Sequence, residues 1–142
     1  MSVNPLQRSR SSLVLALLAA AGLAYDAYVH LDLASVYDGV GDTITQGGLF
    51  RVEAALAIVA ALVVLVSDHR LAWLVAGSVG LGGFAAVVLY RYVDVGAIGP
   101  VPDMYEPVWY GEKTHSALAE GGVGLVWLVR EALRYSASRV RR

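Results

Sequence analysis

The chain has 142 residues, which is room for one domain. It is 57% hydrophobic and 16% charged, with a mean hydropathy of +0.58, so it is more apolar than a typical soluble domain. A net charge of −1 without a basic surface stripe argues against nucleic acid as a partner. The absence of cysteine excludes disulfides, thiolate metal sites and cysteine redox chemistry.

Four apolar segments come close to the roughly 20 residues that a helix needs to cross the ~30 Å hydrocarbon core of a bilayer. Each is apolar all round rather than along one stripe. In chain order they span residues 12–29, 48–66, 71–90 and 114–133. The sequence therefore predicts an all-α fold, a four-transmembrane-helix antiparallel bundle in which residues 1–142 form a single transmembrane domain. Two long outer loops, 31–47 and 91–113, and one tight turn, 67–70, connect the spans.

The distribution of basic residues predicts the orientation, because cytoplasmic loops are enriched in Lys and Arg. Only Arg51, Arg91 and Lys113 lie on the side of the long loops. The other side carries Arg8, Arg10, Arg70, Arg130, Arg134, Arg139, Arg141 and Arg142. Both termini and the tight turn are thus expected in the cytoplasm, and Glu131 beside Arg130 and Arg134 is typical of an exposed helix end. The strong preference for Arg over Lys indicates a bacterial chain, hence a multi-pass protein of the bacterial inner membrane.

A cleaved signal peptide is the alternative interpretation of the first segment. Arg8 and Arg10 precede an apolar run, Leu13 to Ala24, that ends in small residues. A retained span is favoured because Asp26 and His30 follow on one helix face, which a discarded segment does not need.

Ionisable side chains occur within the predicted spans, where each costs roughly 2.5 kcal/mol or more near the bilayer centre unless it has a partner or a cavity. Asp26 and His30 share a face of the first span, and Glu53 lies on a small-residue face of the second. Glu120 lies about 9 Å below the outer end of the fourth span. We interpret these groups as an outward-facing polar pocket. Its predicted ligand-binding residues are Asp26, His30, Arg51, Glu53, Arg91, Lys113 and Glu120.

An internal salt bridge is the alternative account of the same charges. In that case Glu120 pairs with Arg51, Lys113 or Arg91, and the pair only ties helices together. On the fourth span Lys113, Ser116, Glu120 and Gly124 fall on one face, whereas His115 points elsewhere.

The second long loop is predicted to fold back over the outer end of the bundle. Its prolines and glycines prevent a helix, but it is too apolar for a free solvated loop. The expected loop cap consists of Tyr105, Glu106, Trp109 and Tyr110. Tyrosines at the outer helix ends also fit an aromatic belt at headgroup depth.

Known catalytic signatures are missing from the sequence. It contains no Walker loop, G-x-S-x-G, H-E-x-x-H or dinucleotide fingerprint. A single zinc, iron or manganese ion is a further alternative, with Asp26, His30, Glu53 and Glu120 as ligands. The paired Glu-x-x-His motifs of di-iron bundles are absent, so no metal is favoured. The sequence identifies no cofactor and no catalytic residue, and a binding or structural role is favoured over catalysis.

The segments Tyr25–Asp32 and Tyr105–Tyr110 look like family signatures, but no activity attaches to them. The plan of four short spans with polar residues at their outer ends resembles the DoxX-like group of small bacterial membrane proteins. The resemblance is architectural and covers the whole chain. It implies a loose link to respiratory and redox complexes.

Three functions are compatible with these patterns. The first is binding of a small ligand, a lipid or quinone headgroup, or a cation in the pocket. The second is a structural or accessory subunit that docks another membrane protein or a second copy of the chain. The third is a metal- or quinone-dependent membrane oxidoreductase. A cavity at Glu53 and Glu120 would favour the first, and a Glu120 salt bridge without a cavity would favour the second.

Overall fold

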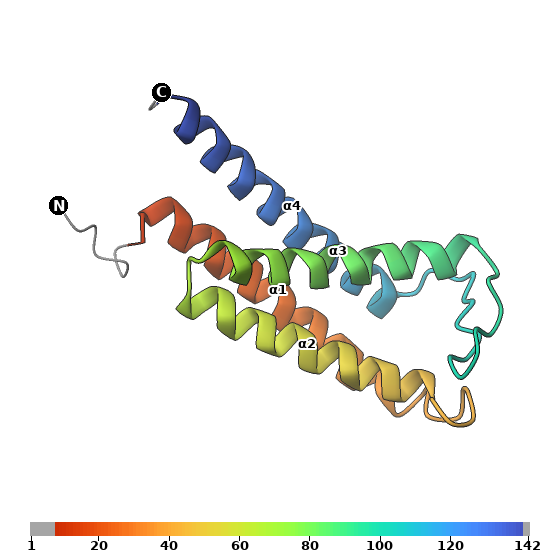
Figure 1. Cartoon of the computed structure of the whole chain (residues 1–142). Coiled ribbons are helices and arrows are strands. Elements are labelled where there is room, and N and C mark those ends of the chain that lie inside the picture. Colours follow the sequence, from red (N-terminus) through yellow and green to blue (C-terminus); the bar gives the residue numbers. More distant parts are fainter. Residues whose placement is uncertain (1–7, 141–142) are drawn as a thin grey trace.

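Four α-helices make up most of the computed structural model, which describes residues 8–140 (Figure 1). They are α1 Arg10–Ala34, α2 Gln46–Val66, α3 Arg70–Tyr92 and α4 Gly111–Val140. Within the described residues there is no β-strand, only an isolated bridge between Ile98 and Val101. The predicted all-α fold is therefore confirmed. Arg141 and Arg142, which contributed to the predicted orientation, lie outside the described residues.

Each helix extends beyond its predicted apolar segment. Side chains cap three of the N-termini: Ser9 accepts from the Ser12 N–H, Thr45 from Gly48 and His69 from Leu71. The helices are longer than predicted because hydropathy detects only their apolar part. Polar residues beyond the apolar part continue each helix, and this extension is longest in α4.

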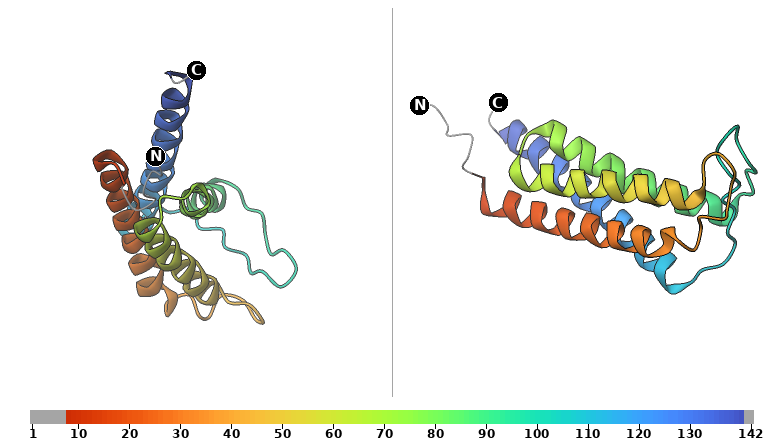
Figure 2. Two further views of the ribbon diagram at one scale, coloured as in Figure 1. Left: turned by 60° about the vertical axis from the view of Figure 1, so that its left-hand side comes forward. Right: turned by 90° about the horizontal axis from the view of Figure 1, so that it is seen from below.

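The helices pack side by side in a ring. α1 packs against α2 and α4, and α3 packs against α4 and α2, so that α2 and α4 lie diagonally opposite each other. The two long connections, residues 35–45 and 93–110, lie at one end of the molecule (Figure 2). The α2–α3 turn, the start of α1 and the end of α4 lie at the other end (Figure 2). The last turns of α4 lean away from the bundle, and residues 132–140 are all exposed (Figure 1).

Small side chains form the helix interfaces. Six alanines are completely buried: Ala16, Ala19, Ala54, Ala57, Ala60 and Ala76. Such residues let helix backbones approach closely, which compensates for the lack of a hydrophobic driving force between helices in lipid. Large apolar side chains such as Leu17, Leu62 and Leu125 point outward instead. This distribution is the reverse of that in a soluble protein.

Three helices within the described chain, α1, α2 and α3, are long and apolar enough to cross a membrane. The fourth predicted span, 114–133, does not meet the same criterion, although α4 has sufficient length. Three charged residues in this range, Glu120, Arg130 and Glu131, account for the difference. Whether α4 could also lie in a membrane therefore depends on whether these side chains face the interior of the bundle.

Glycines allow α3 and α4 to pack closely. A Cβ atom added to Gly77 would overlap the Trp127 ring, and one added to Gly80 would lie 2.8 Å from the Val123 side chain. Gly124 of α4 is in turn covered by Leu81. Gly77 and Gly80 therefore allow close helix packing, as small residues do at helix interfaces in membranes. Gly82 is exposed and has no neighbour within 4 Å of an added Cβ.

Replacing Gly77 by alanine should destabilise the protein by about 1–3 kcal/mol, because the Trp127 ring must move to admit the methyl group. Gly82→Ala is the matched control on the same helix. It should leave stability unchanged or raise it by up to about 1 kcal/mol, since alanine is the better helix former. Thermal melting in mild detergent, followed by circular dichroism, measures both effects. Equal melting temperatures for the two variants would contradict the predicted packing.

A polar network joins three helices at the end of the bundle that carries the α2–α3 turn. The Asp68 carboxylate oxygen Oδ1 accepts hydrogen bonds from Ser12 of α1 (2.7 Å), Trp73 of α3 (3.0 Å) and Arg130 of α4 (3.0 Å). Arg130 also donates to the Asp68 carbonyl at 2.8 Å and to Glu131 at 2.7 Å. Its guanidinium lies 4.6 Å from the centre of the Trp73 ring.

Arg130 is only 3% exposed, so the prediction of a solvated helix end is wrong for this residue. The sequence pattern of Arg130, Glu131 and Arg134 does not distinguish an exposed arginine from one that faces the bundle interior. The partner that draws Arg130 inward, Asp68, is 62 residues away in the chain. Two of the three charged residues within 114–133, Arg130 and Glu131, are therefore paired.

Candidate functional site

A cavity of about 280 Å³ lies at the other end of the bundle, the end with the two long connections. We call it the loop-end cavity. All four helices and the 93–110 connection contribute to its walls. The apolar wall includes Leu49 and Val52 of α2 and Ala86 and Val87 of α3. The polar residues that line it include His30, Gln46, Glu53, Lys113, Ser116 and Glu120. The cavity is thus amphipathic.

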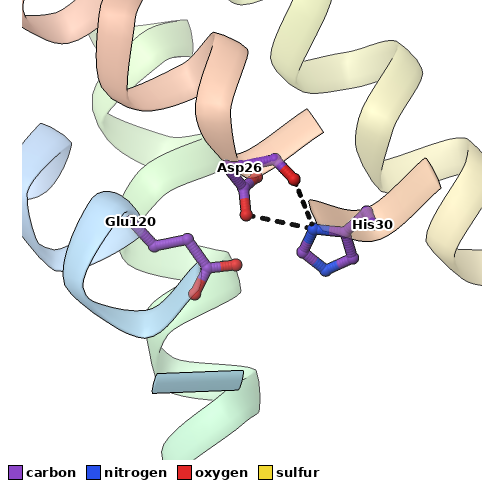
Figure 3. A group of neighbouring side chains, drawn as sticks. All are labelled: Asp26, His30 and Glu120. Carbon is purple, nitrogen blue, oxygen red and sulfur yellow. Dashed lines mark hydrogen bonds and ion pairs between the residues drawn. The ribbon is translucent and has the colours of Figure 1, made fainter. Parts of the chain in front are cut away.

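Asp26 and His30 form the first part of a buried cluster beside this cavity (Figure 3). They are one turn apart on α1, so their side chains lie on the same face. The His30 ring nitrogen Nδ1 lies 3.0 Å from the Asp26 carboxylate oxygen Oδ1 and 3.0 Å from the Asp26 carbonyl oxygen. Ser116 of α4 donates a hydrogen bond of 2.8 Å to the same Oδ1. The Asp26 side chain is therefore held between two helices.

Glu120 completes the cluster from α4 (Figure 3). One potential ligand atom from each of Asp26, His30 and Glu120 can be chosen so that all lie within 4.8 Å of one another. Gly83 of α3 makes room for the Glu120 side chain, because a Cβ at this position would overlap its carboxyl group. We call Asp26, His30 and Glu120 the floor cluster.

Several buried oxygens of the site have no hydrogen-bond partner within the described part of the chain. They are Oδ2 of Asp26, Oε1 of Glu53 and both carboxylate oxygens of Glu120. Glu120 and Asp26 are each 1% exposed, so bulk water does not reach these atoms. A buried acceptor without a donor costs about 1–3 kcal/mol, and more if it is charged. The site therefore requires a proton, a cation or a hydrogen-bond donor from a bound molecule.

The predicted basic partners of Glu120 are engaged elsewhere. Arg51 is exposed, and its two terminal nitrogens donate to both carboxylate oxygens of Asp38. This hydrogen-bonded pair holds the pKa of Asp38 below its ordinary value. Arg91 lies over the Tyr92 and Trp109 rings, and Lys113 donates to the Glu106 carbonyl. Among the described residues, the alternative salt bridge from Glu120 to any of these bases is not formed.

The predicted site residues fall into two groups. His30, Glu53, Lys113 and Glu120 line the loop-end cavity, and Asp26 lies directly beside it through its contacts with His30. Arg51 and Arg91 do not line it. On α4, Lys113, Ser116, Glu120 and Gly124 are all buried whereas His115 is exposed, which confirms the predicted helix face.

The second long loop contributes to the cavity through part of the predicted cap. The Glu106 N–H donates to the Tyr90 carbonyl at 3.0 Å, which fixes the loop against the end of α3. Glu106 and Tyr110 line the cavity, whereas Tyr105 and Trp109 are exposed and do not. The Tyr110 hydroxyl is 3.0 Å from that of Tyr37. Burial and this hydrogen bond raise the pKa of Tyr110 above its ordinary value, so the hydroxyl stays protonated.

Ser116 and Gly83 are parts of the site that the prediction did not include. Ser116 precedes Glu120 by one turn on the same face, and this spacing was a usable signal. The sequence contains no such signal for Gly83. It is adjacent to Gly82, and only the packing of α3 on α4 distinguishes the two glycines.

No family model, curated protein or solved structure matches the chain. The likeness to the DoxX-like group therefore stays a prediction, and the geometry of the site is the basis for any functional conclusion.

Proposed function

We propose that the protein crosses the bacterial inner membrane four times, as an antiparallel bundle with both termini in the cytoplasm, and binds a small amphipathic molecule in the loop-end cavity. The length and composition of α1, α2 and α3 support three of the spans. For α4 the support is the direction of its charges: Glu120 faces the cavity and Arg130 faces Asp68. Leu118, Leu125 and Leu128 of α4 point outward. A span can carry charges that face the bundle interior.

The observation that carries the binding function is the combination of an apolar wall with unpartnered carboxylate oxygens in one cavity. Its volume of about 280 Å³ is at the lower end for small-molecule sites, which are roughly 300–1,000 Å³. As ionised groups, the carboxylates of Glu53 and Glu120 only accept hydrogen bonds, so in that state they select a ligand whose polar end donates hydrogen bonds or carries positive charge. The apolar wall between α2 and α3 accommodates the other end.

Access from the bilayer is consistent with the exposure of this wall. Val52 of α2 lines the cavity but is 56% exposed, and Ala86 of α3 is likewise exposed. In a membrane, an opening at these residues faces lipid chains near the headgroup level. The ligand class that fits is therefore a lipid-soluble molecule with a hydroxyl or amine headgroup, such as a lipid or a reduced quinone.

The accessory-subunit alternative is less well supported. That alternative requires a basic side chain paired with Glu120 and no cavity beside it. Instead, the bases bind Asp38, aromatic rings and a loop carbonyl, and the carboxylate borders a cavity.

Native mass spectrometry of gently solubilised protein tests the proposal. Wild type should carry an organic adduct that Ala86→Phe loses, because the larger side chain fills the cavity. Ala85→Phe is the matched control, since Ala85 is an exposed neighbour outside the cavity, and it should keep the adduct. Loss of the adduct in both variants, or in neither, would refute binding at this site. The spectra are recorded with and without a chelator, so that metal and organic adducts are separated.

A further inference from the structure

We propose that the floor cluster is a binding site for a divalent first-row transition-metal ion, with Asp26, His30 and Glu120 as protein ligands. The proposal does not depend on the organic ligand of the loop-end cavity. It rests on three features: the free oxygens of the carboxylates, the lone pair of the imidazole, and the lack of a Lys or Arg side chain bonded to either carboxylate among the described residues.

Each of the two carboxylates has at least one free oxygen. Both oxygens of Glu120 are buried and have no partner among residues 8–140. On Asp26, Oδ1 is occupied by Ser116 and His30, whereas the equally buried Oδ2 is unpartnered. The bonded oxygen thus orients the side chain, and the free oxygen is left for an ion. Figure 3 shows both carboxyl groups directed into the space beside His30.

His30 has the orientation of a metal-binding histidine. Its Nδ1 is 3.0 Å from the Asp26 carbonyl oxygen. A carbonyl oxygen only accepts hydrogen bonds, so Nδ1 carries the proton and the lone pair is on Nε2. In metal sites the non-ligating ring nitrogen commonly donates to a backbone carbonyl or a carboxylate, which fixes the tautomer and the ring direction. Nε2 of His30 is therefore available as the ligand atom.

The three side chains have to move closer together on binding. Ligands of tetrahedral zinc lie about 2.1 Å from the ion and so roughly 3.4 Å from each other. One ligand atom of each residue now lies within 4.8 Å of the other two, so Glu120, which borders the cavity, and Asp26, which contacts the Nδ1 side of the His30 ring, both turn toward the ion on Nε2. Three protein ligands leave a coordination position free. That position faces the loop-end cavity, because His30 and Glu120 line it.

The charge and chemistry of the ligands define the class of ion. Two carboxylates lie together, and among the described residues no Lys or Arg side chain bonds to either, so a divalent cation would balance their charge. One imidazole and two carboxylate ligands suit zinc, manganese or iron, and the lack of thiolates argues against Cu(I). Glu53 faces the same cavity from α2, but it is not part of the three-residue group.

Zinc titration of metal-free protein tests this site. The protein is purified with a tag that contains no histidine, stripped with a chelator and titrated with Zn²⁺, and separately with Mn²⁺, by calorimetry. Bound metal is counted by elemental analysis after gel filtration. We expect one ion per chain and a loss of affinity of about 100-fold or more in Glu120→Gln. Glu112→Gln, an exposed control in the first turn of α4, should bind as wild type does.

Thermal melting of the same variants separates a metal ligand from a merely structural residue. Zinc should raise the melting temperature of wild type and Glu112→Gln but not of Glu120→Gln. If Glu120→Gln does not fold, His30→Gln gives the same comparison with the carboxylates intact. Wild type that binds no stoichiometric zinc or manganese, or variants that bind them equally well, would overturn the proposal. Since no organic ligand is used, this failure would leave the Ala86→Phe experiment interpretable.

Discussion

Replacing Asp68 by alanine should lower the free energy of unfolding by about 2 kcal/mol, because it leaves the Arg130 guanidinium buried without its main partner. Breaking a fully buried ion pair costs about 3–5 kcal/mol. The expected value is smaller because the Asp68 side chain is 34% exposed and Glu131 still binds Arg130. The hydrogen bonds from Ser12 and Trp73 are lost as well. Unfolding of detergent-solubilised protein by SDS, followed by circular dichroism, measures the effect.

Asp42→Ala is the matched control for this prediction, since Asp42 is an exposed carboxylate in the 35–45 connection. Arg130→Met in the Asp68→Ala background should recover part of the lost stability, because it removes the unpaired charge. Arg130→Met in the wild-type background is the reference. If Arg130→Met lowers the stability of Asp68→Ala as much as it lowers that of wild type, the two residues do not interact.

The effect of Asp68 should depend on pH. Burial by itself would raise the pKa of Asp68, but hydrogen bonds from Ser12, Arg130 and Trp73 outweigh it and hold the pKa below its ordinary value of 3.8. A carboxylate with a lowered pKa stabilises the folded state at pH values above 3.8, and this contribution disappears as the pH falls through the folded-state pKa. The stabilities of wild type and Asp68→Ala should therefore converge in acid.

Gly83→Ala should weaken zinc binding by about tenfold or more without unfolding the protein. The added methyl group overlaps the carboxyl group of Glu120, so Glu120 has to leave its position against α3. Displacing a group that orients a metal site typically costs 10- to 100-fold in affinity. The fold tolerates the change because the atoms that move are the flexible end of one side chain. In Gly77→Ala, by contrast, the rigid Trp127 ring has to move.

Gly82→Ala is the control, since it adds the same methyl group to the adjacent position, which points away from α4 into open space. Zinc affinity measured by calorimetry should be that of wild type in Gly82→Ala and reduced in Gly83→Ala. Equal affinities in all three proteins would show that Glu120 does not need its place beside Gly83 to bind the ion.

Helix positions and inward-facing residues could be predicted from the sequence because both are local properties. Apolar runs locate the helices, and the 3.6-residue period brings Asp26 next to His30 and Ser116 next to Glu120. The same period correctly separates His115 from Glu120. Small residues such as Ala19 and Ala57 marked the interfaces, because only they allow close helix contact.

Only the tertiary structure determines which charged side chains pair with one another. Arg51 binds Asp38 rather than a carboxylate in the cavity, and Arg130 turns inward to Asp68. Glu120, which had three candidate bases, pairs with no base among residues 8–140. Each outcome depends on the relative placement of helices and loops far apart in the chain, whereas sequence spacing specifies only the face of one helix. The loop-end cavity has the same origin: no single segment encodes it, and it exists only where four helix ends and a loop enclose a space that their side chains do not fill.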